Sequence, residues 1–402
     1  INIDFDDSDT LTLFMKKSDS EKINIQKIID LYESGTGNKI KPIIVENAEF
    51  DQKSAEAFSG GDTPDLFFDY NGSGLEELDI QKNFYYMNNE KWVDELTDSI
   101  KVNCLDRDGN VIGLPFWENS LSGCYYNKKI LDSLGLRPAT TQAEFDALCD
   151  ALKTVGYTPL YWSSNDCNWM FQFGLDPIFA DNPDLLDKLN RNEITYSDIP
   201  EVWDMITWFE KAAEKGWFNS NYAEVSWDDI APALKNGESV LLFVWDTWFD
   251  TDFRENGKYS RDDFELMPIF MNTDNMGTYE GGNMNMLMVN KNSPRLDMAL
   301  EFLDFCASPE NYNIAFEDVS TVKCFKHQTT NIQSRMVTNA EVSIKAHQRA
   351  STTRLKITGY RQNDVGEAVL QLFQGKTDVE GCIDLMDKYR IANARELGTE
   401  GF

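Results

Sequence analysis

The residues with the clearest potential for chemistry are tryptophans beside acidic or amide side chains. Trp245-Asp246-x-Trp248 follows an apolar segment, and Trp162 and Trp169 flank a polar stretch. An indole offers a flat apolar face and a neighbouring carboxylate accepts hydrogen bonds, so the pair suits a ring with apolar CH faces and equatorial hydroxyls. The pattern predicts noncovalent binding of a sugar-like ring.

Core packing is the alternative for every one of these residues, because tryptophan is highly buried on average. The position after an apolar segment favours ligand contact for Trp245 and Trp248. For Trp162, Trp169 and Trp227, which lies in Ser226-Trp227-Asp228-Asp229, both interpretations stay open.

The cysteines and histidines of the sequence do not indicate a metal site or a reactive cysteine pair. The seven cysteines are widely and irregularly spaced without a CxxC pair, and His327 and His347 are the only histidines. No zinc or histidine-rich metal centre is predicted, no cofactor is expected, and most cysteines are expected to be buried small hydrophobes. Asp106-Arg107-Asp108-Gly109-Asn110 lacks the glycine and glutamate positions of a calcium loop, and Asp108-Gly109 predicts a hairpin turn instead.

The charge balance limits the class of partner. Among 402 residues, 68 are acidic and 37 basic, which gives a net charge of −31. Such a field repels phosphate backbones and anionic lipids, so nucleic acid and membrane surfaces are disfavoured and a neutral or cationic small ligand fits better. The length favours two domains, and the 42% hydrophobic content is enough for real cores.

Elements that could position these side chains alternate along the chain. Apolar runs predict strands, and apolar residues at helical spacing, such as Ile25, Ile28, Ile29 and Tyr32, predict helices between them. The pattern is typical of an α/β protein with a parallel sheet covered on both faces. The first strands are expected at 11–14, 40–45 and 66–68; helix starts are expected at the capping box Thr141–Glu144 and at Ser293-Pro294.

Four segments in order then resemble a known family. They are Gly61-Asp62-Thr63-Pro64-Asp65-Leu66-Phe67, Asp108 to Pro115 with Tyr125-Tyr126-Asn127-Lys128, Gly135 to Thr141 with Glu144-Phe145, and Gly281-Gly282-Asn283 through Ser293-Pro294 to Ala299-Leu300-Glu301-Phe302-Leu303. They cover most of the chain from Leu11 to about Ser308. The chain is similar to the extracellular solute-binding proteins of type 1, whose best-known relative is the maltose-binding protein. Gln142 departs from the family, which often has tryptophan there.

The resemblance implies a two-lobed, periplasmic-binding-protein-like α/β fold. Each lobe would be a mostly parallel sheet flanked by helices. Lobe one would hold residues 1–118 and 276–320, and lobe two residues 122–270 and 325–402. Hinge segments would lie near 119–121, 271–275 and 321–324.

The resemblance also implies ligand contacts from loops of both lobes. In lobe one the matching positions are Glu46, Asp69, Trp117 and Glu118, and Glu280 and Asn283 could add contacts near the second crossing. Arg361 matches a late contact of lobe two. In so acidic a chain, each lone carboxylate has a solvated surface position as its alternative.

The implied function is a receptor and not an enzyme. It would be the extracellular substrate-binding component of a bacterial ABC transporter that captures a carbohydrate, with an oligosaccharide favoured, and closes about its hinge. It would deliver the ligand to the transmembrane permease subunits, act as a monomer, and be lipid-anchored through a removed N-terminal segment or free in the periplasm. A cationic solute or peptide receptor on the same fold is the alternative, and a glycoside hydrolase is a weaker one.

Overall fold

A computed structural model describes residues 9–61, 63–117, 120–164, 170–245, 248, 253, 257–273, 279–280, 284–319, 323–329, 348–349 and 356–402. The chain divides into two compact units, one formed by residues 1–120 and 281–333 and the other by residues 121–280 and 334–402. Both are discontinuous in sequence. Within the described ranges, no helix combines the length and apolar character that crossing a membrane requires.

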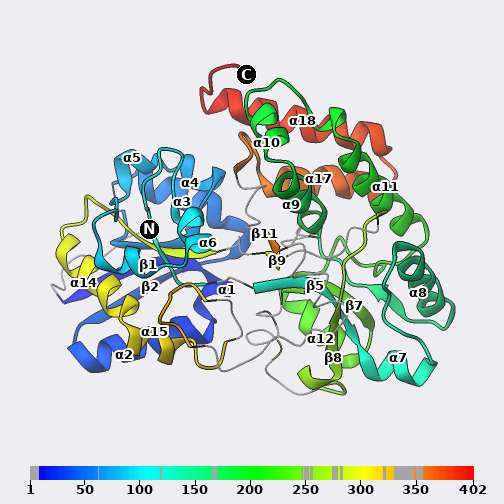
Figure 1. Cartoon of the computed structure of the whole chain (residues 1–402), viewed down its shortest axis with the longest axis horizontal. Helices are drawn as coiled ribbons and strands as arrows, with labels where there is room; N and C mark the ends of the chain where they lie inside the picture. Colours follow the sequence, from blue (N-terminus) through cyan, green and yellow to red (C-terminus); the bar gives the residue numbers. More distant parts are fainter. Residues whose placement is uncertain are drawn as a thin grey trace. The chain divides into compact units, whose positions relative to one another are not determined.

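The first unit is built on a five-stranded sheet in the order β2-β1-β3-β10-β4. Helices cover both of its faces, with α3 and α5 on one and α2, α14 and α15 on the other (Figure 1). The strands are β1 (Thr10–Lys16), β2 (Lys39–Val45), β3 (Leu66–Tyr70), β4 (Leu114–Pro115) and β10 (Asn285–Val289); the helices are α2 (Ile23–Thr36), α3 (Phe50–Ser59), α5 (Ile80–Asn83), α14 (Leu296–Ala307) and α15 (Pro309–Ala315).

In this sheet β1, β2 and β3 run in one direction, and β10 runs in the opposite direction. β1 pairs in parallel with both β2 and β3, as the apolar runs predict. β10 pairs antiparallel with β3 and with β4, because it enters the sheet from a distant part of the chain and not through a helical crossover. The expectation of a mostly parallel sheet therefore holds for β1–β3, and the returning strand runs the other way.

Asp65 is a buried centre of this unit, directly before β3. Its carboxylate accepts hydrogen bonds from the Thr12 N–H at 2.8 Å, the Thr12 hydroxyl at 2.9 Å and the Ser293 hydroxyl at 2.6 Å, and the Arg295 guanidinium lies at 3.2 Å. The prediction that Ser293 caps a helix beginning at Pro294 is wrong by two residues. The Ser293 hydroxyl is engaged by Asp65, and α14 begins at Leu296.

The second unit has a mixed sheet in the order β11-β9-β5-β7-β6, with β8 paired to β5. β6 and β7 are parallel, whereas β5 is antiparallel to β7 and β8. All seven residues of β7 are buried, which explains its continuous apolar sequence. The strands are β5 (Ser120–Asn127), β6 (Thr158–Leu160), β7 (Ser239–Trp245), β8 (Phe264–Met267), β9 (Tyr279–Glu280) and β11 (Gln348–Arg349).

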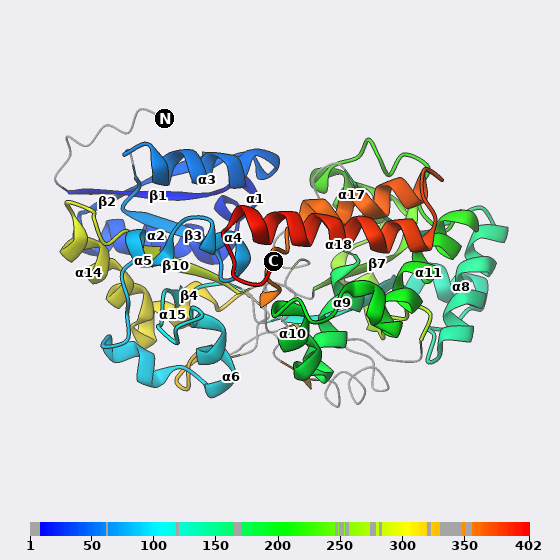
Figure 2. The same ribbon diagram turned by 90° about the horizontal axis from the view of Figure 1, so that it is seen from above.

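Helices from both chain segments cover this second sheet. α17 and α18 lie side by side (Figure 2), and both contact α11. Apolar residues at helical spacing in α11 are buried, among them Val202, Met205, Ile206 and Phe209. The principal helices are α7 (Lys128–Leu134), α8 (Gln142–Thr154), α11 (Pro200–Glu214), α12 (Ile230–Asn236), α17 (Gln362–Phe373) and α18 (Val379–Glu396). The α/β class with two helix-flanked sheets is therefore confirmed.

Two local predictions are confirmed by hydrogen bonds. The expected helix start is found, because the Thr141 side chain accepts the Glu144 N–H at 3.2 Å and caps α8, while the Glu144 carboxylate accepts the N–H of Thr140 at 2.7 Å. At the predicted hairpin, Leu105 bridges Val111 antiparallel, and Gly109 has a φ of 82°, which only glycine adopts at low cost.

The unit boundaries differ from the expected ones in two places. Residues 279–280, which were expected in lobe one, belong to the second unit, where they form β9 and pair in parallel with β11. Residues 325–329 belong to the first unit, because Phe325 bridges Leu96 and the Lys326 N–H donates to the Glu95 carbonyl at 2.9 Å.

Candidate ligand-binding site

The carboxyl ends of β1 and β3 carry a charged pair. Lys16, the last residue of β1, places its Nζ 2.7 Å from Oδ1 of Asp69, and their side chains are 16% and 13% exposed. The same Nζ lies 4.6 Å from the ring centroid of Phe50 and 4.4 Å from that of Tyr70. Burial lowers the pKa of Lys16, but the negative groups around it, Asp69 first and then Tyr70, Asp19 and Asp51, together outweigh burial, so this pKa is raised.

A second lysine covers the indole of Trp117. Lys22 Nζ lies 4.3 Å from the centroid of the Trp117 ring and 2.9 Å from Oδ1 of Asp19. Asp19 is 2% exposed and Trp117 is 3% exposed. The arrangement joins a cation, a carboxylate and an aromatic face in the first unit.

Backbone hydrogen bonds fix the same segment. The N–H groups of Phe116 and Trp117 donate to the Asn285 carbonyl at 3.0 and 3.1 Å. The Asn24 side-chain amide donates to the Phe116 carbonyl at 2.7 Å. Trp117 therefore has a defined position against α2 and the start of β10.

In the second unit, aromatic residues gather where β7 ends. Trp245 is the last residue of β7, and its ring centroid lies 5.3 Å from that of Phe173. Trp248 follows, 5.7 Å from Phe253 by the same measure. Trp245 is 7% exposed and Trp248 is 3% exposed. These rings lie at a strand carboxyl end, where α/β proteins bind ligands.

Trp162 lies in the aromatic core of the second unit. Its ring centroid is 5.5 Å from Phe209, 5.6 Å from Phe218 and 5.2 Å from Phe373. Its indole N–H donates to the Ser164 hydroxyl at 2.7 Å. The packing fits the core alternative for this tryptophan, because both its apolar surface and its polar group are used internally.

The other predicted site residues that the structure describes lie apart from these groups. Trp227 is half-buried at the start of a single 3₁₀ turn, Trp227–Asp229. Glu46 is exposed and lies 3.6 Å from Lys17 in a surface ion pair. Glu280 ends β9, where its backbone pairs with Arg349. Glu118, Trp169, Asp246 and Asn283 lie outside the described residues and stay predictions.

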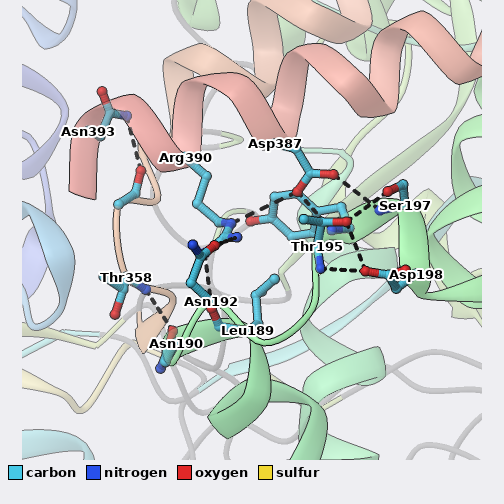
Figure 3. Close-up of polar contacts among 12 residues, drawn as sticks. Leu189, Asn190, Asn192, Thr195, Ser197, Asp198, Thr358, Asp387, Arg390 and Asn393 are labelled. Carbon is cyan, nitrogen blue, oxygen red and sulfur yellow. Dashed lines mark hydrogen bonds and ion pairs between the residues drawn. The ribbon is translucent and has the colours of Figure 1, made fainter. Parts of the chain in front are cut away.

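Arg361 is held by α18. Its Nη1 donates to Asn393 Oδ1 at 2.9 Å, and its Nη2 lies 3.2 Å from Glu396 Oε2. Asn393, which Arg361 contacts, is drawn together with Arg390 in Figure 3. Its contacts give it a role in joining α17 to α18.

The Arg390 network ties three chain segments together. Arg390 Nη1 donates to the Leu189 carbonyl at 3.0 Å, and Nη2 donates to Asn192 Oδ1 at 3.2 Å. Asp387 accepts the N–H groups of Tyr196 and Ser197 at 2.8 and 3.2 Å (Figure 3). These partners are structural, so the network is a support for the second unit.

Sequence reasoning missed Lys16, Asp19 and Lys22. A signal for the first was present, because Lys16 directly follows the apolar run of β1, as Asp69 follows that of β3. Asp19 lies in the short helix α1 (Lys17–Ser20) and Lys22 is the N-cap residue of α2, and nothing in the sequence pairs them with Trp117. Across the described ranges, no three His, Cys, Asp or Glu side chains are grouped so that they could hold a metal ion.

Comparison with solved structures shows the same fold. One, reported with work on xylan utilization by Caldanaerobius polysaccharolyticus, has a TM-score of 0.78 and 19% identity, over 94% of this chain and 99% of the other. Another, a sugar transporter of Bacillus licheniformis in complex with stachyose, has a TM-score of 0.74 and 18% identity, over 96% and 100%. At these identities the likeness concerns the fold alone.

A sequence relative and a family model identify the protein family, which the solved structures do not. An uncharacterized ABC transporter extracellular-binding protein of Pyrococcus horikoshii is 26% identical over 202 residues, and this match spans 48% of this chain and 45% of the relative. The model for bacterial extracellular solute-binding proteins matches residues 18–313, which include most of the first unit and much of the second. The chain belongs to the family of bacterial extracellular solute-binding proteins.

Proposed function

We propose that this protein is the carbohydrate-capturing component of a bacterial ABC importer, with an oligosaccharide as the favoured ligand. The observation that carries the proposal is the aromatic group at the carboxyl end of β7, Trp245 with Phe173 and Trp248 with Phe253. Flat rings at a strand end suit the apolar faces of sugar rings. The stachyose complex and the xylan study named above support the same ligand class for this fold.

The lysines of the first unit favour a neutral ligand over a cationic one. A receptor for a cationic solute needs an aromatic face or carboxylate that is open to the ligand's charge. Here the Lys16 ammonium lies over Phe50 and Tyr70 and pairs with Asp69. Lys22 likewise covers Trp117 and pairs with Asp19. A second positive charge at either place would meet repulsion from the resident lysine.

A calorimetric panel of oligosaccharides tests the proposal. We expect saturable binding by at least one sugar, a raised melting temperature in its presence, and little change in affinity with added salt. Affinity that falls steeply with salt, for a cationic solute, would favour the alternative ligand class. Turnover of an oligosaccharide would show a glycoside hydrolase and overturn the receptor assignment.

The remaining features of the proposal concern its partners and motion. The receptor would deliver its ligand to the transmembrane permease subunits as an extracellular or periplasmic monomer, lipid-anchored or free. The two units would close on the ligand about hinge segments. Small-angle scattering with and without ligand tests closure, and sedimentation velocity tests the monomer. An unchanged radius of gyration at saturating ligand would argue against closure.

A further inference from the structure

Trp117 lies where the chain leaves the first unit, and Asn285 lies where it returns. The unit boundaries fall at residues 120 and 281, so both residues are close to a crossing. The Asn285 carbonyl accepts the N–H groups of Phe116 and Trp117 at 3.0 and 3.1 Å. One carbonyl therefore ties the outgoing and returning segments together.

A chain of side-chain contacts also leads from Asn285 to the indole of Trp117. Asn285 Nδ2 lies 3.3 Å from each Asp19 carboxylate oxygen. Asp19 Oδ1 is 2.9 Å from Lys22 Nζ, which lies 4.3 Å from the centroid of the Trp117 ring. Asn285 thus fixes the backbone of Trp117 directly and is linked to its indole through Asp19 and Lys22.

Burial strengthens the charge interactions among these side chains. The side chain of Lys22 is 13% exposed and that of Asp19 is 3% exposed. Charges with little water around them interact more strongly with each other and with an aromatic face. A ring already held in one orientation loses little freedom when a ligand binds to it.

We infer that Asp19, Lys22 and Asn285 are positioning residues that hold the Trp117 indole in its ligand-binding orientation. The inference rests on the proposed function and on the expectation, from the family resemblance, that Trp117 is one of the ligand contacts of the first unit. In this scheme Lys22 acts through Trp117 and does not itself contact the ligand. A cation above the ring is what matters, so arginine should replace lysine and methionine should not.

The test compares Lys22→Met, Lys22→Arg and Trp117→Phe in the full chain. Affinity for the best oligosaccharide of the panel is measured by calorimetry. The orientation of the indole is followed without ligand by near-ultraviolet circular dichroism, where the Trp117 signal is the wild-type spectrum minus that of Trp117→Phe. We expect Lys22→Met to lose this signal and to bind about tenfold more weakly, whereas Lys22→Arg keeps both.

Lys211→Met is the matched control. Lys211 lies in the second unit, pairs with Asp146, and has its Nζ 5.9 Å from the centroid of the Trp217 ring. Removing this cation should leave both the Trp117 signal and the affinity unchanged. Asp19→Asn gives an independent variant, with a loss in the same direction as Lys22→Met, should the methionine variant fold poorly.

The outcomes separate the inference from the proposed function. If Lys22→Met keeps the Trp117 signal and native affinity, the positioning role is overturned even though the protein binds sugar. If Lys22→Arg loses as much as Lys22→Met, a cation above the ring is not the cause. If the wild type binds no carbohydrate, the proposed function fails. The ligand-free spectra would still decide whether Lys22 holds the indole.

Discussion

The Lys16 ammonium lies 2.7 Å from Asp69 Oδ1, so the ends of two parallel strands are joined by a nearly buried ion pair. The strands β1 and β3 are neighbours in the sheet, but their pairing covers only Leu13–Phe14 and Leu66–Phe67. The ion pair continues the contact between them beyond these residues. Removing one partner would leave the other charge buried without compensation.

We expect Lys16→Met to lower the free energy of unfolding at pH 7 by about 3 kcal/mol. Burial raises the pKa of Asp69, and Lys16 lowers it, so loss of Lys16 raises this pKa further. A carboxyl whose pKa is higher when folded stabilises the fold while protonated and loses this contribution as pH rises. Denaturation at pH 4 and pH 7 should therefore show a smaller loss at pH 4. Equal losses, or no recovery in the Lys16→Met/Asp69→Asn double variant, would contradict the pairing argument.

Trp245→Ala should weaken carbohydrate binding by more than about tenfold, because the variant loses a large aromatic contact surface. The variant should still fold, at a cost of about 3 kcal/mol for the space left beside Phe173. Calorimetry measures the affinity, and circular dichroism checks the fold. Trp208→Phe is the control, because Trp208 is fully buried beside Phe243 and should affect stability alone. Native affinity for Trp245→Ala would place this tryptophan among the core residues.

Gly359→Ala should destabilise the protein by about 3 kcal/mol through crowding. A Cβ at Gly359 would lie 2.1 Å from the Arg390 carbonyl and 2.9 Å from the Ala394 nitrogen, on the rigid backbone of α18. Gly375→Ala is the matched control: it has a similar positive φ of 64° and nothing within 4 Å. It should cost about 1 kcal/mol, from the left-handed conformation alone. Urea denaturation measures the free energy of unfolding of both variants. Equal losses of stability would contradict the crowding argument.

Thiol reactivity tests the cysteine positions. Cys104, Cys124, Cys149, Cys306, Cys324 and Cys382 are buried, and burial raises the pKa of Cys382, for example, to about 12. Cys167 lies outside the described residues, so Cys167→Ser isolates the other six. The thiolate is the reactive form, so at pH 8 the buried thiols of this folded variant should react with Ellman's reagent only slowly. In guanidinium the chain unfolds, and all six thiols should react. Rapid reaction of the folded variant would show an exposed thiol among the six.

The sequence predicts the fold better than the site, for a physical reason. β1, α2, β2 and β3 follow from local periodicity and from a glycine at the end of α2, so they can be recognised without the rest of the chain. Antiparallel pairing of β10 depends on a segment that returns from far along the chain, and no local pattern encodes it.

The site depends on the same long-range contacts. Trp162 has the sequence context of a ligand residue, but Phe373 of α17 packs against it from the C-terminal part of the chain. Lys22 lies over Trp117 only because α2 and the segment after β4 meet in space. An aromatic residue beside an acid thus indicates a type of chemistry, while tertiary packing decides which of these residues is available for it.

The late arrival of β10 also bears on how the protein is made. β3 and β4 both pair with β10, so the ribosome must synthesise beyond Val289 before the first sheet can be completed. Until then, the buried edge of β3 is open and its backbone groups are available to other chains. Such non-local pairing slows folding. The first sheet is therefore incomplete until the segment of β10, which follows most of the second unit in the chain, has paired with β3 and β4.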